Sequence, residues 1–458
     1  MKSMKKILPI VIAGVLVLGG LGASAFSIKK TTTLSASVDE YDMVIIAPDT
    51  FSASIQPLIT HKNSHGVNTF LKTTEDIYNE YTGRDDAEKV KYFIKDALEQ
   101  YGITYVLLIG GMKPLSFNWF VPVRYSNLND GSGHEVFLTD LYFADVYKEN
   151  GDFEDWDSNG NGIFAEWGFT GDKLDLNPDV AVGRLPCRTT DEVKTVVEKI
   201  ITYENTAYGK SWFNQMVVVG GDTFPDYAGY EGEATCDVAS SYMNDFTIKK
   251  LYASTGTLSG PDDIIDAVNQ GCGFLLTRGR GGTDRVRMVM PEGAEFVAFN
   301  IDSISQLNNK DMYPIVVLGE CIHGRFDVGI INIIKLLQKD PEYNAYDCIY
   351  ECIAWRLISE KNAGAIATIT NTNICYGDIG DDNHNGILDD AEVYGGFLAV
   401  ELFRLFAQEG IDTLGILHQK ALSNYVDLLP VDKDKIHCKS VQEFILFGDP
   451  SLKIGGYA

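Results

Sequence analysis

The sequence PIVVLGECIHGRFD, residues 314–327, lies at the centre of the predicted architecture. The five apolar or small residues after the proline predict a buried parallel strand. The pattern then turns polar and contains glycine, which places Cys321 just beyond the end of that strand. Because open α/β sheets bind their ligands at the carboxyl ends of parallel strands, Cys321 is the candidate nucleophile.

Apolar runs alternate with stretches of helical spacing on both sides of this strand. The other expected strands are 43–47, 67–71, 105–110, 179–183, 216–219, 248–252, 273–277, 363–370 and 444–447. The expected helices are 52–64, 86–100, 189–208, 231–244, 261–269, 329–338, 346–361, 394–408 and 414–424. This βαβ rhythm predicts an α/β fold of two successive parallel-sheet subdomains, residues 39–208 and 209–458.

The N-terminus has the pattern of an export signal. Lys2, Lys5 and Lys6 precede an apolar run from Ile7 to Leu21, and the sequence ASA at 23–25 offers a cleavage site. We therefore expect a signal peptide at residues 1–25 and a linker at 26–38. The alternative is an uncleaved membrane anchor, because the run is almost long enough to span a bilayer. Either way, the protein is expected to be secreted or to lie at the cell surface.

Composition and charge narrow the range of partners. The formal net charge is −26, which argues against nucleic acid and anionic lipid as partners. Contact with a membrane is expected only through an uncleaved N-terminal segment. The eight cysteines are too sparse in 458 residues for a disulfide framework.

Two acidic loops, DWDSNGNGIFAE (155–166) and DDNHNGILDDAE (381–392), match the twelve-residue calcium-binding pattern. Each has a glycine at position 6 for the sharp turn and a glutamate at position 12. The expected ligands are Asp155, Asp157, Asn159, the Asn161 carbonyl and Glu166 in the first loop, and Asp381, Asn383, Asn385, the Ile387 carbonyl, Asp389 and Glu392 in the second. Free calcium is abundant outside cells, so we expect two structural Ca²⁺ sites that stay filled.

Six segments, in the same order along the chain, resemble the gingipain-type cysteine endopeptidases of the caspase-like clan. They are TDLYFAD (139–145), DVAVGRLPCRTTDEVKTVVEKIITYE (179–204), GRGG (279–282), ECIHGRFD (320–327), GAIATITNT (364–372) and LFGDPSL (446–452). The resemblance implies a caspase-like catalytic domain of two α/β subdomains, calcium sites, and a protein or peptide substrate.

The resemblance also implies roles for individual residues. Cys321 falls on the family nucleophile, and the amides of Gly281 and Cys321 would form the oxyanion hole. Asp140 falls on the aspartate at the floor of the P1 pocket, where it would favour Arg or Lys before the scissile bond. Tyr376 falls on the aromatic wall of that pocket.

This chain departs from the family at the catalytic histidine, whose position is occupied by Arg280. A guanidinium cannot accept a proton, although its charge could favour a Cys321 thiolate. His323 would project to the same side as Cys321 if the chain stays extended, so it is the first candidate base. His134, in the loop before Asp140, and a water molecule are the other candidates.

Two functions from different classes follow. The first is an exported, calcium-stabilised cysteine endopeptidase that cleaves after Arg or Lys. The second is a catalytically inactive pseudoenzyme of the same fold, acting as an extracellular binding or structural module. In the second case Cys321 would be a buried structural cysteine.

Overall fold

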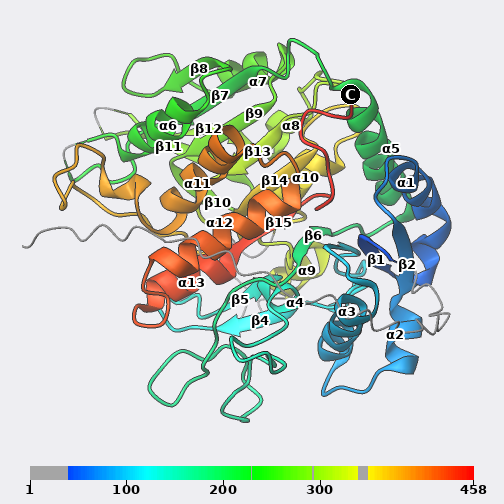
Figure 1. The fold of residues 1–458 in the computed structure, drawn as a ribbon. Helices are drawn as coiled ribbons and strands as arrows, with labels where there is room; N and C mark the ends of the chain where they lie inside the picture. Colours follow the sequence, from blue (N-terminus) through cyan, green and yellow to red (C-terminus); the bar gives the residue numbers. More distant parts are fainter. Residues whose placement is uncertain (1–39, 228, 291–292, 339–348) are drawn as a thin grey trace, which may run out of the picture. The chain divides into compact units, whose positions relative to one another are not determined.

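The computed structural model describes residues 40–458 except 228, 291–292 and 339–348. The predicted signal peptide and linker lie outside these described residues. Asp39–Ala458 form one compact unit around a ten-stranded sheet. The strands lie in the order β2 (Thr69–Thr73), β1 (Met43–Ala47), β3 (Tyr105–Ile109), β6 (Ala181–Leu185), β15 (Phe444–Phe447), β14 (Ala367–Asn371), β13 (Ile315–Leu318), β9 (Phe274–Arg278), β7 (Gln215–Gly220) and β8 (Thr247–Tyr252) (Figure 1).

The strands before and after residue 208 occupy opposite ends of this one sheet, and β15 joins the two ends. β15 is parallel to β6 on one side and antiparallel to β14 on the other. The predicted parallel pairing holds for β1 with β2 and β3, and for β13 with β9 and β14. The sequence predicts the strand at 444–447 but not its antiparallel direction.

Two groups of helices cover the sheet. Strands such as β6, β13 and β14 are buried along their whole length, so both faces of the sheet must be covered. In one group, α5 (Thr190–Thr206) contacts α1 (Ser52–Ser64) and α10 (Ile353–Ser359). In the other, α11 (Tyr394–Glu409) contacts α6 (Glu231–Tyr242) and α12 (Leu414–Leu428), and these three lie in front of the sheet in Figure 1.

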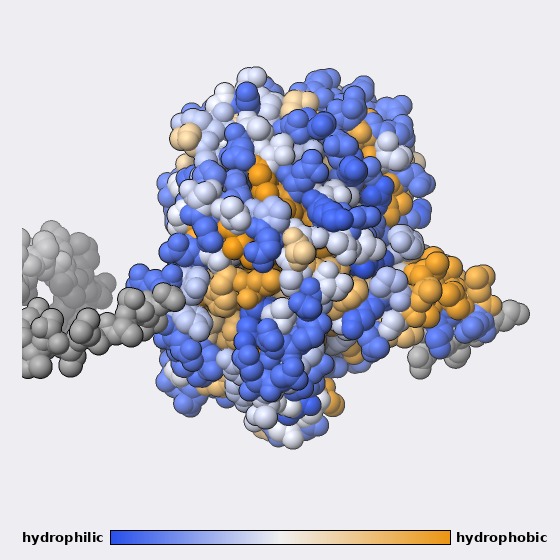
Figure 2. All heavy atoms as spheres, turned by 90° about the vertical axis from the view of Figure 1, so that its right-hand side faces the viewer, coloured by the Kyte–Doolittle hydropathy of each residue, from blue (hydrophilic) through white to orange (hydrophobic). Residues whose placement is uncertain are grey.

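The remaining helices connect or flank these groups. They are η1 (Asp49–Phe51), α2 (Thr74–Glu80), α3 (Asp86–Tyr101), α4 (Leu141–Ala144), α7 (Pro261–Asn269), α8 (Ile301–Ile304), α9 (Ile330–Leu337), η2 (Asp389–Ala391) and α13 (Lys435–Glu443). Among the described residues, no helix has the length and apolar character needed to cross a bilayer. Hydrophilic side chains cover most of the face shown in Figure 2, in keeping with the net charge of −26.

Two small antiparallel sheets lie outside the predicted pattern. One consists of β10 (Arg280–Gly282), β11 (Arg285–Val289) and β12 (Glu295–Asn300), and β10 begins two residues after β9 ends. The other pairs β4 (Arg124–Asn127) with β5 (Val136–Thr139), directly before Asp140. Both sheets therefore extend from segments that carry predicted site residues.

A buried ion cluster gives Asp449, in the sequence GDPSL near residue 450, a structural role. Lys62 Nζ of α1 lies 2.8 Å from Glu204 Oε1 of α5 and 2.7 Å from Asp449 Oδ2, and these three side chains have no exposed surface. The other oxygen of Asp449 accepts hydrogen bonds from the backbone N–H and hydroxyl of Ser451. Asp449 thus fixes its own turn and also ties it to two helices from the N-terminal part of the chain.

Candidate active site

Cys321 lies in a strained turn at the carboxyl end of β13. Ile322, the next residue, has a φ of +52°, a value that β-branched residues rarely adopt. The turn is held by two backbone hydrogen bonds: Ile322 N–H donates to the Asn373 carbonyl (2.8 Å) and Gly324 N–H donates to the Asn371 carbonyl (2.9 Å). The last residue of β14 and the chain just after it therefore fix the turn that presents Cys321.

Gly281 of β10 lies directly against Cys321. A Cβ atom at position 281 would come within 2.1 Å of the Cys321 carbonyl oxygen and 2.6 Å of its amide nitrogen, so only glycine fits there. The structure thus brings together the two residues whose amides are predicted to bind an oxyanion. The oxyanion role itself stays a prediction.

The Cys321 sulfur is held as a thiol. Its Sγ donates a hydrogen bond to the Cys375 carbonyl at 3.2 Å. Burial raises the pKa of the Cys321 thiol above its ordinary value, and the nearby charge of Glu443 raises it further. Because burial disfavours the thiolate, Cys321 needs a proton acceptor before it can attack a carbonyl group.

His323 does not contact the thiol. Its fully buried ring has Nε2 2.9 Å from the Arg285 carbonyl and Nδ1 3.4 Å from Glu320 Oε2. The expectation that positions 321 and 323 face the same side assumes an extended chain, and this assumption is wrong because Ile322 has a positive φ. The proposed base role of His323 therefore loses its geometric basis.

The Arg280 side chain reaches from β10 to Glu295 at the start of β12, within the same small sheet. Its side chain is 48% exposed and lies 3.3 Å from Glu295 Oε2. Glu295 also binds Arg287, at 2.7 Å, and Arg287 donates to the Gly281 carbonyl at 2.8 Å. The residue at the family histidine position thus takes part in an ion-pair network of the small sheet.

Asp140 is already paired within the protein. Its two carboxylate oxygens accept hydrogen bonds from Arg184 Nε (2.6 Å) and Nη2 (2.8 Å), and Asp140 is only 7% exposed. Arg184, buried on β6, also donates to the carbonyls of Gly110, Val121 and Pro122. The charge of the Asp140 carboxylate is therefore balanced by Arg184 in this structure, and its role at the floor of a P1 pocket stays a prediction.

Tyr376 belongs to a second partly buried network. Its hydroxyl donates to Asp130 Oδ2 at 3.1 Å, and Lys439 forms an ion pair with the same carboxylate. Burial alone would raise the pKa of Asp130, but hydrogen bonds from Lys439 and Ser132 lower it to about 2. The Tyr376 ring is thus fixed in place, and its role as a pocket wall stays a prediction.

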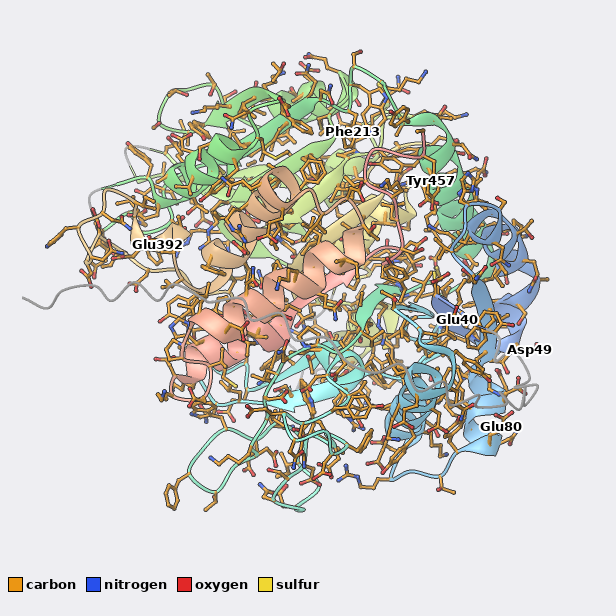
Figure 3. The ribbon with its side chains drawn as sticks, viewed as in Figure 1. Glu40, Asp49, Glu80, Phe213, Glu392 and Tyr457 are labelled. Carbon is orange, nitrogen blue, oxygen red and sulfur yellow. The ribbon has the colours of Figure 1, made fainter. Side chains whose placement is uncertain are left out.

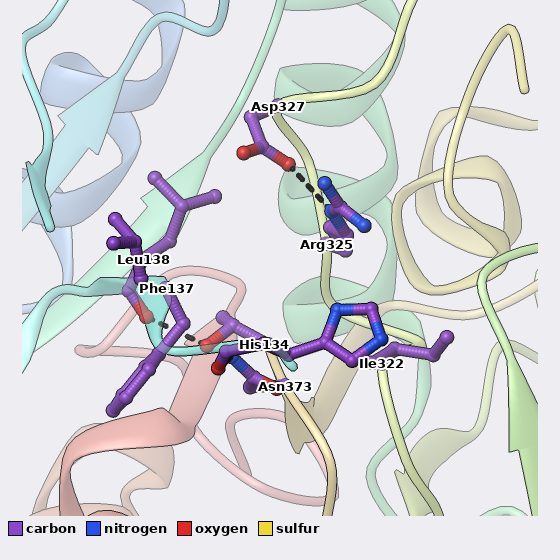
Figure 4. A pocket seen from close by; sticks show the side chains of 9 residues that line it. His134, Phe137, Leu138, Ile322, Arg325, Asp327 and Asn373 are labelled. Carbon is purple, nitrogen blue, oxygen red and sulfur yellow. Dashed lines mark hydrogen bonds and ion pairs between the residues drawn. The ribbon is translucent and has the colours of Figure 1, made fainter. Parts of the chain in front are cut away.

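A small pocket lies beside the Cys321 turn (Figure 4). It is lined by His134, Val136, Phe137, Leu138, Ile322, Arg325, Asp327, Thr372 and Asn373. Arg325 Nε lies 3.3 Å from Asp327 Oδ1, and Asn373 Nδ2 donates to the His134 carbonyl at 3.0 Å. Of the histidines predicted as bases, His134 is the one that lines this pocket.

Sequence reasoning missed a buried arginine next to the nucleophile. Arg278, at the end of β9, binds Asp390 through Nε (3.0 Å) and Nη2 (2.5 Å). Its Nη1 donates to the Gly319 carbonyl and lies 3.6 Å from the Cys375 sulfur. An arginine that ends a strongly apolar strand is the signal that could have identified it.

The first calcium-type loop contains a competing cation. Arg84 Nη1 lies 2.6 Å from Asp157 Oδ2, and Nη2 lies 3.4 Å from Asp155 Oδ2. Asn161 Nδ2 donates to Glu166 Oε2 at 2.8 Å, so positions 7 and 12 do meet. The donor atoms suit calcium, but Arg84 already balances part of their charge.

The second loop fits calcium better. Asn383 and Asn385, at positions 3 and 5, each donate to Glu392 at 2.7 Å, so the side chains at positions 3, 5 and 12 converge. Asp381 accepts the backbone N–H groups of Asn385 (3.0 Å) and Gly386 (2.9 Å), and Gly386 has a φ of +88°. In the described part of the chain no group of three His, Cys, Asp or Glu side chains is arranged to hold a metal ion, so each loop would rely on amide and carbonyl oxygens as well.

Comparisons with known proteins agree with this fold. The family model of Peptidase family C25 matches residues 37–455. Gingipain R2 of Porphyromonas gingivalis strain W83 is 21% identical over 307 residues, covering 65% of this chain and 34% of that protein. Gingipain R1 of Porphyromonas gingivalis is 22% identical over 294 residues, covering 62% and 24%. The chain thus spans about a third or less of the length of these relatives.

The chain is also similar to solved structures. The crystal structure of the Arg-specific cysteine proteinase gingipain R (RgpB) superposes with a TM-score of 0.63 at 19% identity, covering 91% of this chain and 78% of that one. The complex of the Porphyromonas gingivalis RgpB pro- and mature domains gives a TM-score of 0.61 at 20% identity, covering 90% and 79%. The predicted gingipain-type α/β fold is confirmed.

Proposed function

This chain belongs to peptidase family C25, and on that basis we propose that it is a cysteine endopeptidase with Cys321 as its nucleophile. The observation that carries the proposal is the setting of Cys321. A buried parallel strand leads to it, the strained residue Ile322 follows it, and the backbone of Gly281 lies against it. Backbone strain of about 1–3 kcal/mol persists only where surrounding contacts impose it, and it clusters at functional sites.

In the proposed reaction, the Cys321 sulfur attacks a peptide carbonyl carbon of a protein substrate and forms a thioester as the C–N bond breaks. The amine leaves after it takes up a proton, and water then hydrolyses the thioester to a carboxylate and the free thiol. The amides of Gly281 and Cys321 would donate to the oxygen on which negative charge develops. The proton of the thiol would pass to His134 or to a water molecule, because the His323 ring is engaged by Arg285 and Glu320.

Cleavage of unstructured proteins in the presence of reductant and calcium tests this proposal. We expect Cys321→Ala to abolish cleavage and Cys272→Ala, which removes a buried thiol elsewhere in the fold, to leave it nearly unchanged. Loss in His134→Ala with retention in His323→Ala would identify His134 as the base. Cleavage that survives Cys321→Ala would overturn the assignment of the nucleophile.

A preference for Arg or Lys before the scissile bond is a further part of the proposal. Its support is the position of Asp140 and the similarity of the fold to RgpB, an Arg-specific proteinase. Because Asp140 is bound bidentately by Arg184, a substrate guanidinium would have to replace Arg184. Mapping cleavage sites in a mixed peptide pool tests this, and equal cleavage after neutral residues would contradict the preference.

The second candidate function is a pseudoenzyme that acts as an extracellular binding or structural module. It is favoured by Arg280 at the family histidine position and by the buried contacts of His323. No cleavage by the wild type, together with activity gained by Arg280→His, would support the pseudoenzyme. Cleavage by the wild type that requires Cys321 would exclude it.

Calcium binding and export complete the proposal. The convergent side chains of the second loop support a Ca²⁺ site there, while Arg84 makes the first loop the weaker candidate. Added calcium should raise the melting temperature, and Glu392→Gln should remove most of that rise. Detection of the mature protein outside the cells that make it, with a new N-terminus after Ala25, would test export and signal cleavage.

A further inference from the structure

A buried ion pair connects the second calcium-type loop with the Cys321 turn. Asp390 occupies position 10 of the loop, between the predicted ligands Asp389 and Glu392, and has no exposed surface. Its carboxylate is bound by Arg278 through two guanidinium nitrogens, at 3.0 and 2.5 Å. Thr235 Oγ1 of α6 donates to the same carboxylate at 2.7 Å. Asp390 therefore points inward from the loop, away from the predicted metal position.

The other end of Arg278 reaches the two segments that form the Cys321 site. Nη1 donates to the carbonyl of Gly319, two residues before Cys321. The same nitrogen lies 3.6 Å from the sulfur of Cys375, whose carbonyl accepts the hydrogen bond from the Cys321 thiol. Arg278 is 2% exposed, so these contacts are shielded from water and solvent cannot easily replace them.

We propose that Arg278 is a positioning residue that couples calcium binding in the 381–392 loop to the geometry of Cys321. This inference rests on the calcium site proposed above, and it adds a path by which that site acts on the nucleophile. Asp389 and Glu392 would hold the calcium ion, and they flank Asp390 at the loop end that contacts α6 and α11. Glu392 is labelled in Figure 3. An ordered Asp390 fixes Arg278, and Arg278 in turn fixes Gly319 and Cys375.

The second loop is the better candidate for this coupling because the first loop has no comparable connection among the described residues. Two of its acidic side chains, Asp155 and Asp157, are bound by Arg84, which also pairs with Glu88. The first loop therefore supplies a matched control within the same chain. Glu166 and Glu392 occupy the same loop position, so their Gln variants perturb equivalent groups.

The readout is the rate at which iodoacetamide alkylates Cys321 at fixed pH, followed by mass spectrometry of the peptide that contains it. With the site ordered, the partly buried thiol donates a hydrogen bond to the Cys375 carbonyl, so calcium should slow alkylation. We expect about a fivefold effect, which corresponds to a coupling free energy of about 1 kcal/mol. The melting temperature, measured in parallel, reports calcium binding itself.

Four variants test the path. Glu392→Gln should lose both calcium responses, and Glu166→Gln should keep the alkylation response. Arg278→Lys and Asp390→Asn should still show a calcium-dependent rise in melting temperature but no change in alkylation. Two different substitutions are used because replacement of the buried arginine could prevent folding.

Each outcome decides the inference. An alkylation response that persists in folded Arg278→Lys or in Asp390→Asn overturns it. A wild type whose melting temperature rises with calcium while its alkylation rate is unchanged also overturns it, but leaves the calcium site standing. No response of either kind removes the calcium site and the coupling together. None of these results depends on whether the protein cleaves peptides.

Discussion

Lys62→Met should destabilise the protein strongly, although Lys62 lies far along the chain from Cys321. The substitution keeps the length of the side chain but removes the positive charge that faces Glu204 and Asp449. Both carboxylates are fully buried, so water cannot replace the ammonium group. Removing one partner of a buried ion pair typically costs about 3–5 kcal/mol.

The expected shift in melting temperature follows from the size of the folded unit. Asp39–Ala458 comprise roughly 420 residues, and an unfolding entropy of about 2.1 cal/mol/K per residue gives roughly 0.9 kcal/mol/K. A loss of about 3–5 kcal/mol then lowers the melting temperature by roughly 3–6 °C. The triple variant Lys62→Met/Glu204→Gln/Asp449→Asn should recover most of this loss, because no buried charge is left unpaired.

The loss of stability in Lys62→Met, relative to the wild type, should also depend on pH. Burial alone would raise the pKa of Glu204, but the charge of Lys62 lowers it below its ordinary value. In the wild type, this carboxylate thus adds stability above its unfolded pKa of about 4.3, and the gain is lost as the pH falls. Without Lys62, burial raises the folded pKa instead. The difference in unfolding free energy between the wild type and Lys62→Met should therefore shrink as the pH is lowered towards 4.

The assay is thermal unfolding by circular dichroism from pH 4 to 8, with Lys95→Met as the control. Lys95 and Glu99 form a partly exposed ion pair at 2.8 Å on α3, and such pairs contribute about 0.3–0.5 kcal/mol. Equal melting temperatures for Lys62→Met and Lys95→Met would refute the reasoning. A stability difference between the wild type and Lys62→Met that grows as the pH falls would also refute it.

Three further predictions concern other buried charges. Burial lowers the pKa of Lys199 to about 7, so above that pH the unfolded chain binds a proton that the folded protein has lost. The unfolding free energy of the wild type, measured in urea, should therefore rise from pH 7 to 10, and Lys199→Met should not show this rise. Burial raises the pKa of Glu443 to about 8, so between about pH 4.3 and 8 the folded state holds a proton that the unfolded chain has lost. Stability from this group therefore falls as the pH rises through that range. The unfolding free energy of Glu443→Gln should rise relative to that of the wild type from about pH 5 to 8 and level off above it, and parallel curves would contradict this. Asp140→Asn leaves the Arg184 guanidinium unpaired in the core and should lower unfolding free energy by about 3 kcal/mol, whereas an unchanged urea midpoint would show that the ion pair is dispensable.

Helices and strands whose apolar residues form runs or recur at regular spacing could be predicted from the sequence. The observed bounds of β1, β15, α1 and α7 coincide with the expected ranges. In contrast, α13 was missed because several of its buried residues, including Lys439, Gln442 and Glu443, are polar, so its buried side carries little apolar signal. The short strand β10 was missed because it consists of arginine and glycine alone, and β11 was missed because it is short and its pairing with β10 is local.

The candidate site was predictable only in part. The association of Gly281 with Cys321 agrees with the resemblance to the gingipain-type family, and it depends on β10 following β9 closely. The position of His323 could not be predicted, because the left-handed conformation of Ile322 is imposed by hydrogen bonds to Asn371 and Asn373 from a distant part of the chain. Isoleucine gives no local sign of such a turn.

The central place of β15 has a consequence for biosynthesis. Of the strands in the described residues it is the last to be made, yet β6 and β14 both need it as a neighbour. Until residue 447 has left the ribosome, both of those strands present unpaired edges that could associate with other chains. The chain between residue 185, where β6 ends, and residue 447, where β15 ends, takes roughly 13–52 s to make at about 5–20 residues per second, and the edge of β6 is exposed for that time. The nascent chain should therefore depend on holding factors that keep it from aggregating before its sheet can close.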